Sequence, residues 1–529
     1  MNAQQQTNLA AANIAHTALA EIDVTATGCV QYRSKGRLLV IASSDALELI
    51  EYLEHIPEVI WLQTDTARTA AIEKVVVIPV AGRPLSLSGH LGAFELAVHN
   101  ADETRIELQA DIILDLGEPP LLKLPLPPPG YLLAHLQDET FSQLTAQVAE
   151  LIGTFEKPRY FRYDPAICAH SRAGLTGCTL CIDTCPAEAI SSVDNRLAVN
   201  PYLCQGGGIC ASVCPSGAMR FAYPGPADTL AQVRTLLSRY YAAGGRDAQL
   251  LFSARSELTT PVQDNTLLVQ VEEVGSIGPE IMLGALAYGA RQVVLLDGGE
   301  IPEMVREALI DQIKMIEAIL QGMHYPALVV RLVAEAESDY ADGAVMPAIP
   351  AATFTALDEK QRVFTLAAEH LYDHAVDALD IIPLPDGAPF GRVDIKTAQC
   401  TLCMACTSVC PGHALDAGLD RPQLIFRELN CVQCGLCVQA CPESALTLTS
   451  RFLCHSEQRR KAIILHEEPP FCCVTCGAAF ATRSAIDNML KKLEGHPMFQ
   501  DDKARQRLMM CEECRVVDAI QDSQLMELV

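Results

Sequence analysis

The sequence predicts a chain of the α+β class that folds as several domains, and three observations predict this. The chain has 529 residues, half of them apolar, so it exceeds the size of one hydrophobic core and has enough apolar side chains for several. All but one of its 22 cysteines gather in two internal fields and one C-terminal group. Strand and helix patterns alternate between the fields, and short β-branched runs precede them. The expected division is a flexible segment 1–17, a mostly β domain over 18–140, and units over 155–225, 227–380, 388–450 and 451–529.

The N-terminal domain is predicted from apolar runs separated by turn residues. The runs typical of strands are Arg37–Ala42, Glu58–Leu62, Lys74–Val80 and Ala110–Asp115. A helix is expected over Ser44–His55, and the isolated Cys29 is expected to be a buried thiol. The proline-rich segment Leu124–Gly130 breaks both kinds of element and marks a boundary. Helical periodicity follows it over Asp138–Phe155.

Charge and targeting signals restrict the partners and the compartment. A formal charge of −26 argues against nucleic acid or an anionic membrane surface, since both are bound by basic patches. No run of about 20 apolar residues is present, so no membrane span is expected. Cysteines in C-x2-C runs without a secretion signal indicate metal thiolates in a reducing compartment, so we expect the cytoplasm.

The second cysteine field, Cys400–Cys441, repeats one spacing twice. Each half reads C-x2-C-x2-C-x3-C-P, in which three thiolates of one loop bind one iron-sulfur cluster and the fourth binds the other. The pair implies two [4Fe-4S] clusters and resembles the bacterial two-cluster ferredoxin module. Cluster C would be held by Cys400, Cys403, Cys406 and Cys441, and cluster D by Cys431, Cys434, Cys437 and Cys410. A structural zinc pair is the alternative, but zinc leaves the third and fourth cysteine of each run unexplained.

The first cysteine field, Cys168–Cys214, is a modified copy of the second. All four ligand runs end in C-P-x-x-A followed by an apolar residue, which indicates a duplicated module. The small alanine is expected to let a helix pack beside the cluster. Leu175 stands where the first cysteine belongs, and a longer loop can deliver Cys168 instead. Cluster A would use Cys168, Cys178, Cys181 and Cys214, with His170 as an alternative ligand or a hydrogen-bond donor to sulfur.

The other half of the first field has Gly207 at the second ligand position. Cluster B would therefore have three thiolates, from Cys185, Cys204 and Cys210. This C-x5-C-x3-C-P run resembles the [3Fe-4S] loop in the iron-sulfur subunits of fumarate reductase and succinate dehydrogenase. The resemblance implies a [3Fe-4S] cluster, or a [4Fe-4S] cluster with a labile or differently ligated iron. Another cysteine reaching the open position is the alternative.

The middle of the chain predicts a parallel, three-layer α/β unit. Strand patterns cover Gln249–Ala254, Thr266–Val271, Gln292–Asp297 and Ala327–Val333, and helical patterns cover Ile277–Tyr288 and Pro302–Met323. The run from Gly275 resembles the small flavodoxin-like electron-transfer subunit associated with heterodisulfide reductase and hydrogenase. That family carries cysteines here and this region has none. Without a G-x-G-x-x-G or Walker sequence, a docking scaffold is favoured over flavin or nicotinamide binding.

Two C-x2-C knuckles near the C terminus predict a separate metal site. Cys473, Cys476, Cys511 and Cys514 supply four thiolates, a set typical of structural zinc. Iron fits the same geometry, and a further iron-sulfur cluster is an alternative if Cys472 or Cys454 joins. With zinc, those two cysteines are expected to be buried thiols, and a helix is expected over Ser484–Leu493.

Together these motifs favour electron transfer. The chain resembles the multi-cluster ferredoxin-type proteins that accompany molybdenum- or tungsten-containing formate dehydrogenases, and the resemblance implies redox proteins as partners. No catalytic grouping is found beside the cysteines. The sequence therefore favours an electron-transfer subunit with three or four iron-sulfur clusters. A flavin-containing oxidoreductase subunit and an iron-sulfur sensing or maturation factor are the alternatives.

Overall fold

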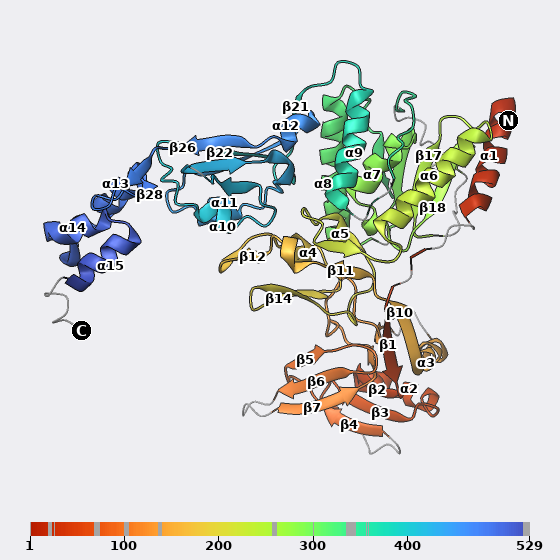
Figure 1. Cartoon of the computed structure of the whole chain (residues 1–529). Coiled ribbons are helices and arrows are strands. Elements are labelled where there is room, and N and C mark those ends of the chain that lie inside the picture. The colour runs from red at the N-terminus through yellow and green to blue at the C-terminus, as the bar shows by residue number, and fades with distance from the viewer. Residues whose placement is uncertain are drawn as a thin grey trace.

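The computed structural model describes residues 2–19, 24–25, 27–67, 75–99, 105–135, 140–255, 262–299, 301–334, 345–355, 357, 359–419 and 421–521, and the backbone alone for Ser171 and Arg172. Figure 1 shows the β-rich N-terminal unit at one end, with the first cysteine field between it and an α/β unit. The second field and the C-terminal unit extend from the side of the α/β unit. None of the described helices combines the length and the apolar character that spanning a bilayer requires.

A five-stranded parallel sheet forms the centre of the N-terminal unit. Its strand order is β4-β3-β2-β8-β9, with β2 (Arg37–Ala42), β3 (Glu58–Gln63), β4 (Val75–Pro79), β8 (Ile112–Asp115) and β9 (Tyr131–Leu133). One face packs against an antiparallel sheet, made of β5 (Leu85–Ser88), β6 (Phe94–His99) and β7 (Arg105–Ala110). The other face packs against short helices, which are η1 (Ser44–Ala46), α2 (Leu49–Tyr52) and α3 (Phe141–Glu150). The predicted strands are confirmed over the described residues, with Lys74 lying outside them, whereas the helix expected over Ser44–His55 is two shorter helices.

An antiparallel pair connects this unit to the first field. It consists of β1 (Cys29–Ser34) and β10 (Gly153–Pro158). Residues of β1 alternate between exposed and buried, and Cys29 falls on an exposed position. The prediction of a buried Cys29 thiol is therefore wrong, because the alternation of the strand turns that side chain to solvent.

The N-terminal segment is a helix, which corrects the expectation of a flexible stretch over 1–17. Helix α1 (Ala3–Leu19) packs along α6 (Pro226–Ala242) and lies beside it in Figure 1. Ala11 and Ala15 are fully buried in the core of the α/β unit. The Asn8 side chain donates to Asp264 over 2.7 Å. Small side chains let the two helices approach closely, and this packing orders a segment whose own sequence carries a weak apolar stripe.

The α/β unit has a four-stranded parallel sheet in the order β18-β17-β19-β20. Its elements are β17 (Gln249–Ser253), β18 (Thr266–Gln270), η3 (Val274–Ser276), α7 (Pro279–Ala287), β19 (Gln292–Leu296), α8 (Glu303–Gly322), β20 (Val330–Val333) and α9 (Lys360–Asp373). Helices α1 and α6 to α9 share one core with one face of the sheet. Leu251, Val294 and Leu296 on the other face form a separate cluster that contains no residue of a described helix. Among the described residues, the expected three layers are therefore not present.

The two cysteine fields are built from short strands and one-turn helices. The first contains β11 (Phe161–Tyr163), η2 (Pro165–Ile167), β12 (Ser171–Arg172), β13 (Leu175–Thr176), α4 (Leu180–Asp183), β14 (Ile190–Val193), β15 (Arg196–Val199), α5 (Ile209–Ser212) and β16 (Met219–Phe221). The second contains β21 (Ile381–Pro383), β22 (Gly391–Ile395), α10 (Ala405–Ser408), β23 (Leu415–Ala417), β24 (Gln423–Phe426), η5 (Glu428–Asn430), α11 (Leu436–Ala440), β25 (Leu446–Leu453), α12 (Ser456–Arg460) and β26 (Ile463–Glu467).

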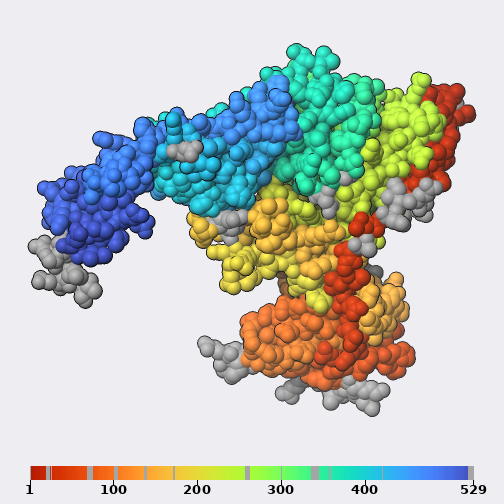
Figure 2. All heavy atoms as spheres, in the orientation of Figure 1, coloured from red at the N-terminus to blue at the C-terminus, as the bar shows by residue number. Residues whose placement is uncertain are grey.

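The second field is fixed against the α/β unit by aromatic packing. Phe364 of α9 stacks on Phe390 with ring centroids 4.4 Å apart, and Phe452 of β25 meets both rings edge-on. Cys454 is buried in the same core. The space-filling view in Figure 2 shows the second field seated against the α/β unit. The C-terminal unit follows it with β27 (Pro470–Cys472), β28 (Ala479–Thr482), α13 (Arg483–Lys492), η6 (Pro497–Phe499), α14 (Asp502–Leu508) and α15 (Glu512–Gln521).

Candidate metal centres

The four C-P-x-x-A turns share one backbone structure. The residue three positions after the cysteine has a positive φ in every copy: Glu188, Gly217, His413 and Ser444. The alanine that follows is buried in every copy: Ala189, Ala218, Ala414 and Ala445. A strand then begins one residue later, which gives β14, β16, β23 and β25. In every copy the left-handed residue turns the chain into an extended strand after the alanine, and the one-turn helix that precedes the cysteine contacts that strand.

Cysteine group C brings together Cys400, Cys403, Cys406 and Cys441. Their side chains line one hollow, together with Leu424 and Leu446. Burial raises the pKa of Cys406 to about 12, and the thiols Cys403, Cys400 and Cys441 act in the same direction. The Ala445 N–H donates to Cys441 Sγ over 3.3 Å, so the alanine of the motif supplies a hydrogen bond to the sulfur.

Cysteine group D brings together Cys431, Cys434, Cys437 and Cys410 around a second hollow. Burial raises the pKa of Cys431 to about 12, partly opposed by hydrogen bonds from Gln433. The Ala414 N–H donates to Cys410 Sγ over 3.2 Å, and Gln433 Nε2 donates to Cys431 Sγ over 3.2 Å. Groups C and D are thus lined largely by apolar side chains and provided with N–H donors, which suits an anionic iron-thiolate cluster.

Cysteine group A brings together Cys168, Cys178, Cys181 and Cys214. Burial raises the pKa of Cys181 to about 12, and the thiols of the other three act in the same direction. The β12–β13 hairpin occupies the inserted loop and returns Cys178 to Cys168: the Cys178 N–H donates to Ala169 O over 2.9 Å. Gly177 closes this turn, and a Cβ there would lie 2.4 Å from the Ala169 carbonyl oxygen.

His170 holds the loop of group A through three bonds. Its Nδ1 lies 3.0 Å from the Cys178 carbonyl oxygen, and its Nε2 lies 2.7 Å from Ser192 Oγ. Its backbone N–H donates to Cys168 Sγ over 3.4 Å. Both ring nitrogens are therefore engaged, so the alternative of His170 as a ligand does not fit this geometry, while the alternative of a donor to sulfur is met by the backbone.

Cysteine group B brings together three thiols, from Cys185, Cys204 and Cys210. Burial raises the pKa of Cys210 well above its usual range, and Cys204 and Cys185 act in the same direction, followed by Cys181 and Cys214 of group A. A Cβ at Gly207 would meet nothing within 4 Å, so the fourth position has space but no thiol.

A cavity of about 160 Å³ adjoins Gly207. It lies at the carboxyl ends of three parallel strands and is lined by Ser253, Val274 and Leu296, with Pro186 on the cysteine side. Ligands of open α/β sheets bind at such edges. Pockets for drug-sized ligands and cofactors measure roughly 300–1,000 Å³, so this cavity is small for a flavin or a nicotinamide dinucleotide.

The four groups follow one another in the order B, A, D, C. Groups B and A meet through Cys210 and its neighbours Cys181 and Cys214. Groups A and D lie beside each other. Leu436 of α11 packs against Gly177, and the Cys434 thiol is near enough to raise the pKa of Cys178. Groups D and C are also neighbours, since the Cys406 thiol is near enough to raise the pKa of Cys437. The two fields are therefore in direct contact through groups A and D.

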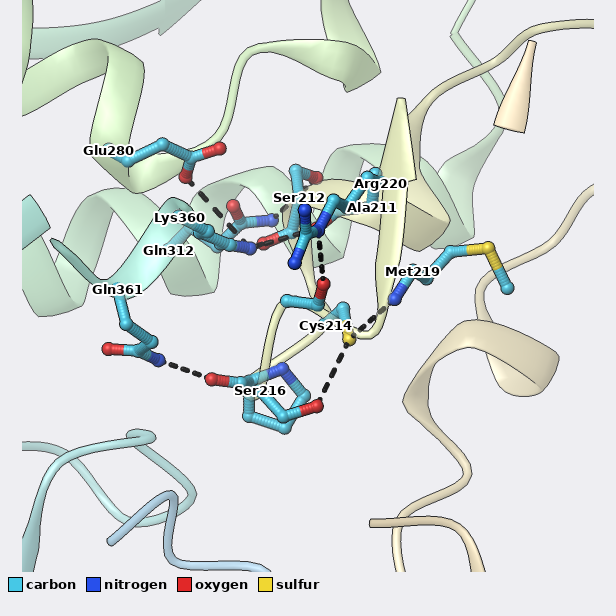
Figure 3. Close-up of polar contacts among 12 residues, drawn as sticks. Ala211, Ser212, Cys214, Ser216, Met219, Arg220, Glu280, Gln312, Lys360 and Gln361 are labelled. Carbon is cyan, nitrogen blue, oxygen red and sulfur yellow. Dashed lines mark hydrogen bonds and ion pairs between the residues drawn. The ribbon is translucent and has the colours of Figure 1, made fainter. Parts of the chain in front are cut away.

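Two partly buried lysines lie beside the first field, and sequence reasoning missed both. Lys157 Nζ donates to the carbonyl oxygens of Tyr202 and Cys204 over 3.0 and 2.6 Å. Figure 3 shows Lys360, the first residue of α9, reaching the α5 segment. Lys360 Nζ donates to Ala211 O over 2.9 Å and to Ser212 O, and Gln361 donates to Pro215 O. No motif marks these lysines, because tertiary packing brings them to the cysteines.

The C-terminal cysteines form a tighter group. The Sγ atoms of Cys473, Cys476, Cys511 and Cys514 all lie within 4.8 Å of one another, and those of Cys476 and Cys511 are 3.6 Å apart. Four sulfurs about 2.3 Å from a tetrahedral zinc lie about 3.8 Å apart. Burial would raise the pKa of Cys473, but backbone N–H groups of Cys476, Cys511 and Thr475 lower it to about 6.

Cys454 and Cys472 lie outside this C-terminal group. Cys454 is buried as expected, in the core of the α/β unit, whereas Cys472 is exposed. The prediction of a buried Cys472 is therefore wrong, because it ends the short edge pair β27–β28. The tight spacing of the four remaining sulfurs fits one metal ion rather than a further cluster. None of the 22 cysteines forms a disulfide.

Comparison with known proteins identifies the chemistry of the second field. Residues 393–446 match the family model of a 4Fe-4S dicluster domain. Over 68 residues the chain is 35% identical to hydrogenase-4 component A of Escherichia coli (strain K12), which covers 13% of this chain and 31% of that protein. The chain thus matches about a third of that relative's length. These similarities and the clustered cysteines support an iron-sulfur protein of the ferredoxin type with a role in electron transfer.

Proposed function

We propose that this chain relays single electrons between an oxidoreductase and another carrier through four iron-sulfur clusters in the order B, A, D, C. The proximity of each cysteine group to the next supports this most strongly. When bound, such clusters accept and release single electrons. The cysteines hold them, the buried alanines and leucines keep water away, and N–H groups donate to the sulfurs.

The ligand sets that we propose follow the four cysteine groups. Groups A, D and C each supply four thiolates for a [4Fe-4S] cluster. Group B supplies three, which favours a [3Fe-4S] cluster or a [4Fe-4S] cluster with a labile iron. The C-terminal group is proposed to hold zinc as a structural clip.

For the partner we propose an oxidoreductase of the hydrogenase or formate dehydrogenase type. The name of the matched relative supports the first, and the resemblance in the sequence supports the second. The net charge of −26 favours docking onto basic surfaces of that partner, and a reducing compartment such as the cytoplasm would keep the thiols reduced.

The test is anaerobic purification with iron, acid-labile sulfide and zinc analysis, followed by electron paramagnetic resonance (EPR). We expect about 15 iron atoms per chain, from three clusters of four and one of three, and one zinc. The spectra should contain a [3Fe-4S]-type signal in the oxidised protein and [4Fe-4S] signals in the reduced protein. A full zinc complement without acid-labile sulfide would refute the proposal.

A further inference from the structure

The two lysines beside the first field are partly buried, and their ammonium groups donate mainly to backbone carbonyls. The Lys360 side chain is 11% exposed, and its partners Ala211 and Ser212 lie between the ligands Cys210 and Cys214. Lys157 donates to the carbonyl oxygen of Cys204 itself and lies over the Tyr32 ring at 4.8 Å. Each lysine therefore places positive charge next to a cysteine group.

In the described part of the chain the two lysines have one ion-pair partner between them, the buried Glu280 beside Lys360. Among the described residues, Lys157 has no carboxylate within ion-pair distance. The nearest carboxylate oxygen to Lys360 is Oε2 of Glu280, 3.9 Å from Nζ, beyond hydrogen-bond distance. Glu280 is itself buried, and its burial raises the pKa of the carboxyl, opposed by the charge of Lys360.

The second field has a different charge arrangement. Three of its arginines pair with carboxylates at 2.5 to 2.7 Å: Arg392 with Asp394, Arg427 with Asp416, and Arg451 with Glu428. In the part of the chain that the structure describes, no lysine or arginine side chain donates to a backbone carbonyl of Cys400–Cys410 or Cys431–Cys441. The second field also has eight thiolates where the first has seven.

The lysines beside the first field and its smaller number of thiolates both favour reduction of the first field over the second. An added electron is stabilised by nearby positive charge and destabilised by each extra thiolate, and these effects are strong in a buried site. We propose that Lys157 and Lys360 make the first field the electron-accepting end of the chain, so that electrons enter at group C and collect at groups A and B. In each transfer the second field loses one electron and the first field gains it.

This inference rests on the proposed function, and its first test uses the unchanged protein. An EPR-monitored redox titration of the reconstituted full chain should show the first field reduced before the second. Cys181→Ser and Cys406→Ser variants assign the signals to the two fields. If the second field is reduced first, the inference is wrong while the relay stands; if no cluster signals exist, the proposed function itself fails.

The second test removes each charge while keeping the side-chain length. In Lys360→Met we expect the ratio of reduced to oxidised first-field clusters, at a fixed solution potential, to fall about tenfold, which corresponds to about 59 mV for one electron. Lys157→Met should lower it in the same direction, and Lys360→Arg should restore most of the change. The reduction potentials of the second-field clusters should stay unchanged in all three variants.

The matched control is Lys314→Met. Lys314 lies on α8 of the same α/β unit, and its exposed side chain pairs with Asp311, so its removal should shift neither field. Equal potentials in wild type and Lys360→Met, with iron content unchanged, would overturn the role of Lys360. A loss of iron in Lys360→Met leaves the order of reduction in the wild-type protein as the deciding measurement.

Discussion

The two cysteine fields carry the same repeat but differ in how completely they keep it. The second keeps both C-x2-C-x2-C-x3-C-P runs, and each of its two groups collects four thiols. The first has lost two ligand positions, at Leu175 and Gly207. The β12–β13 hairpin replaces the first loss by delivering Cys168, whereas a Cβ at Gly207 would face open space. The first field therefore has a thiol in place of Leu175 but none in place of Gly207.

The largest expected effect comes from removing one ligand in each field. Cys437→Ser should lose cluster D, about four iron atoms per chain, and Cys210→Ser should lose cluster B, about three. Iron and sulfide counts measure the difference, with the exposed Cys29→Ser as control. Equal losses in the two variants would show that group B holds a complete four-iron cluster.

Gly207→Cys should make the first field resemble the second. The new thiol has room, so we expect about one more iron per chain and loss of the [3Fe-4S]-type EPR signal. Gly207→Ala is the matched control, because it adds the Cβ without the sulfur and should leave the signal unchanged. If the signal persists in the Gly207→Cys variant, the cluster position without a thiolate does not lie next to residue 207.

The contact between the fields is tested by Leu436→Ala. Leu436 is fully buried and packs against Gly177 of the first field, so its truncation should lower the free energy of unfolding by about 2–5 kcal/mol. It should also slow electron transfer between the fields in pulse radiolysis. Leu424→Ala, inside the second field, should cost similar stability without slowing that transfer. If both variants transfer electrons at the same rate, the path does not run through groups A and D.

How much of this could be predicted depends on whether the signal is local. The C-x2-C spacing, the parallel strands of the middle unit and the C-terminal knuckles are all short-range patterns, and the structure brings the expected cysteines together in each group. The positions of Lys157 and Lys360 could not be predicted, because Lys360 is separated from Ala211 by 149 residues. The ordering of α1 was missed for the same reason, since α6 supplies its partner surface. The exposure of Cys29 depends on which alternate residues of β1 face solvent, and the sequence around Cys29 does not show this.

The smallest effect that we predict concerns a hydrogen bond in the second field. Gln433 Nε2 donates to Cys431 Sγ over 3.2 Å, which stabilises added negative charge on group D. Gln433→Leu should therefore lower the reduced-to-oxidised ratio of cluster D about threefold, within the range of one hydrogen bond of about 0.5–1.5 kcal/mol. If the first field is the electron-accepting end, this change increases the difference in reduction potential between the two fields. Gln423→Leu, which removes a surface bond to Glu467, is the control for redox titration. A rise in that ratio would mean that Gln433 acts through the packing of its loop rather than through its bond to sulfur.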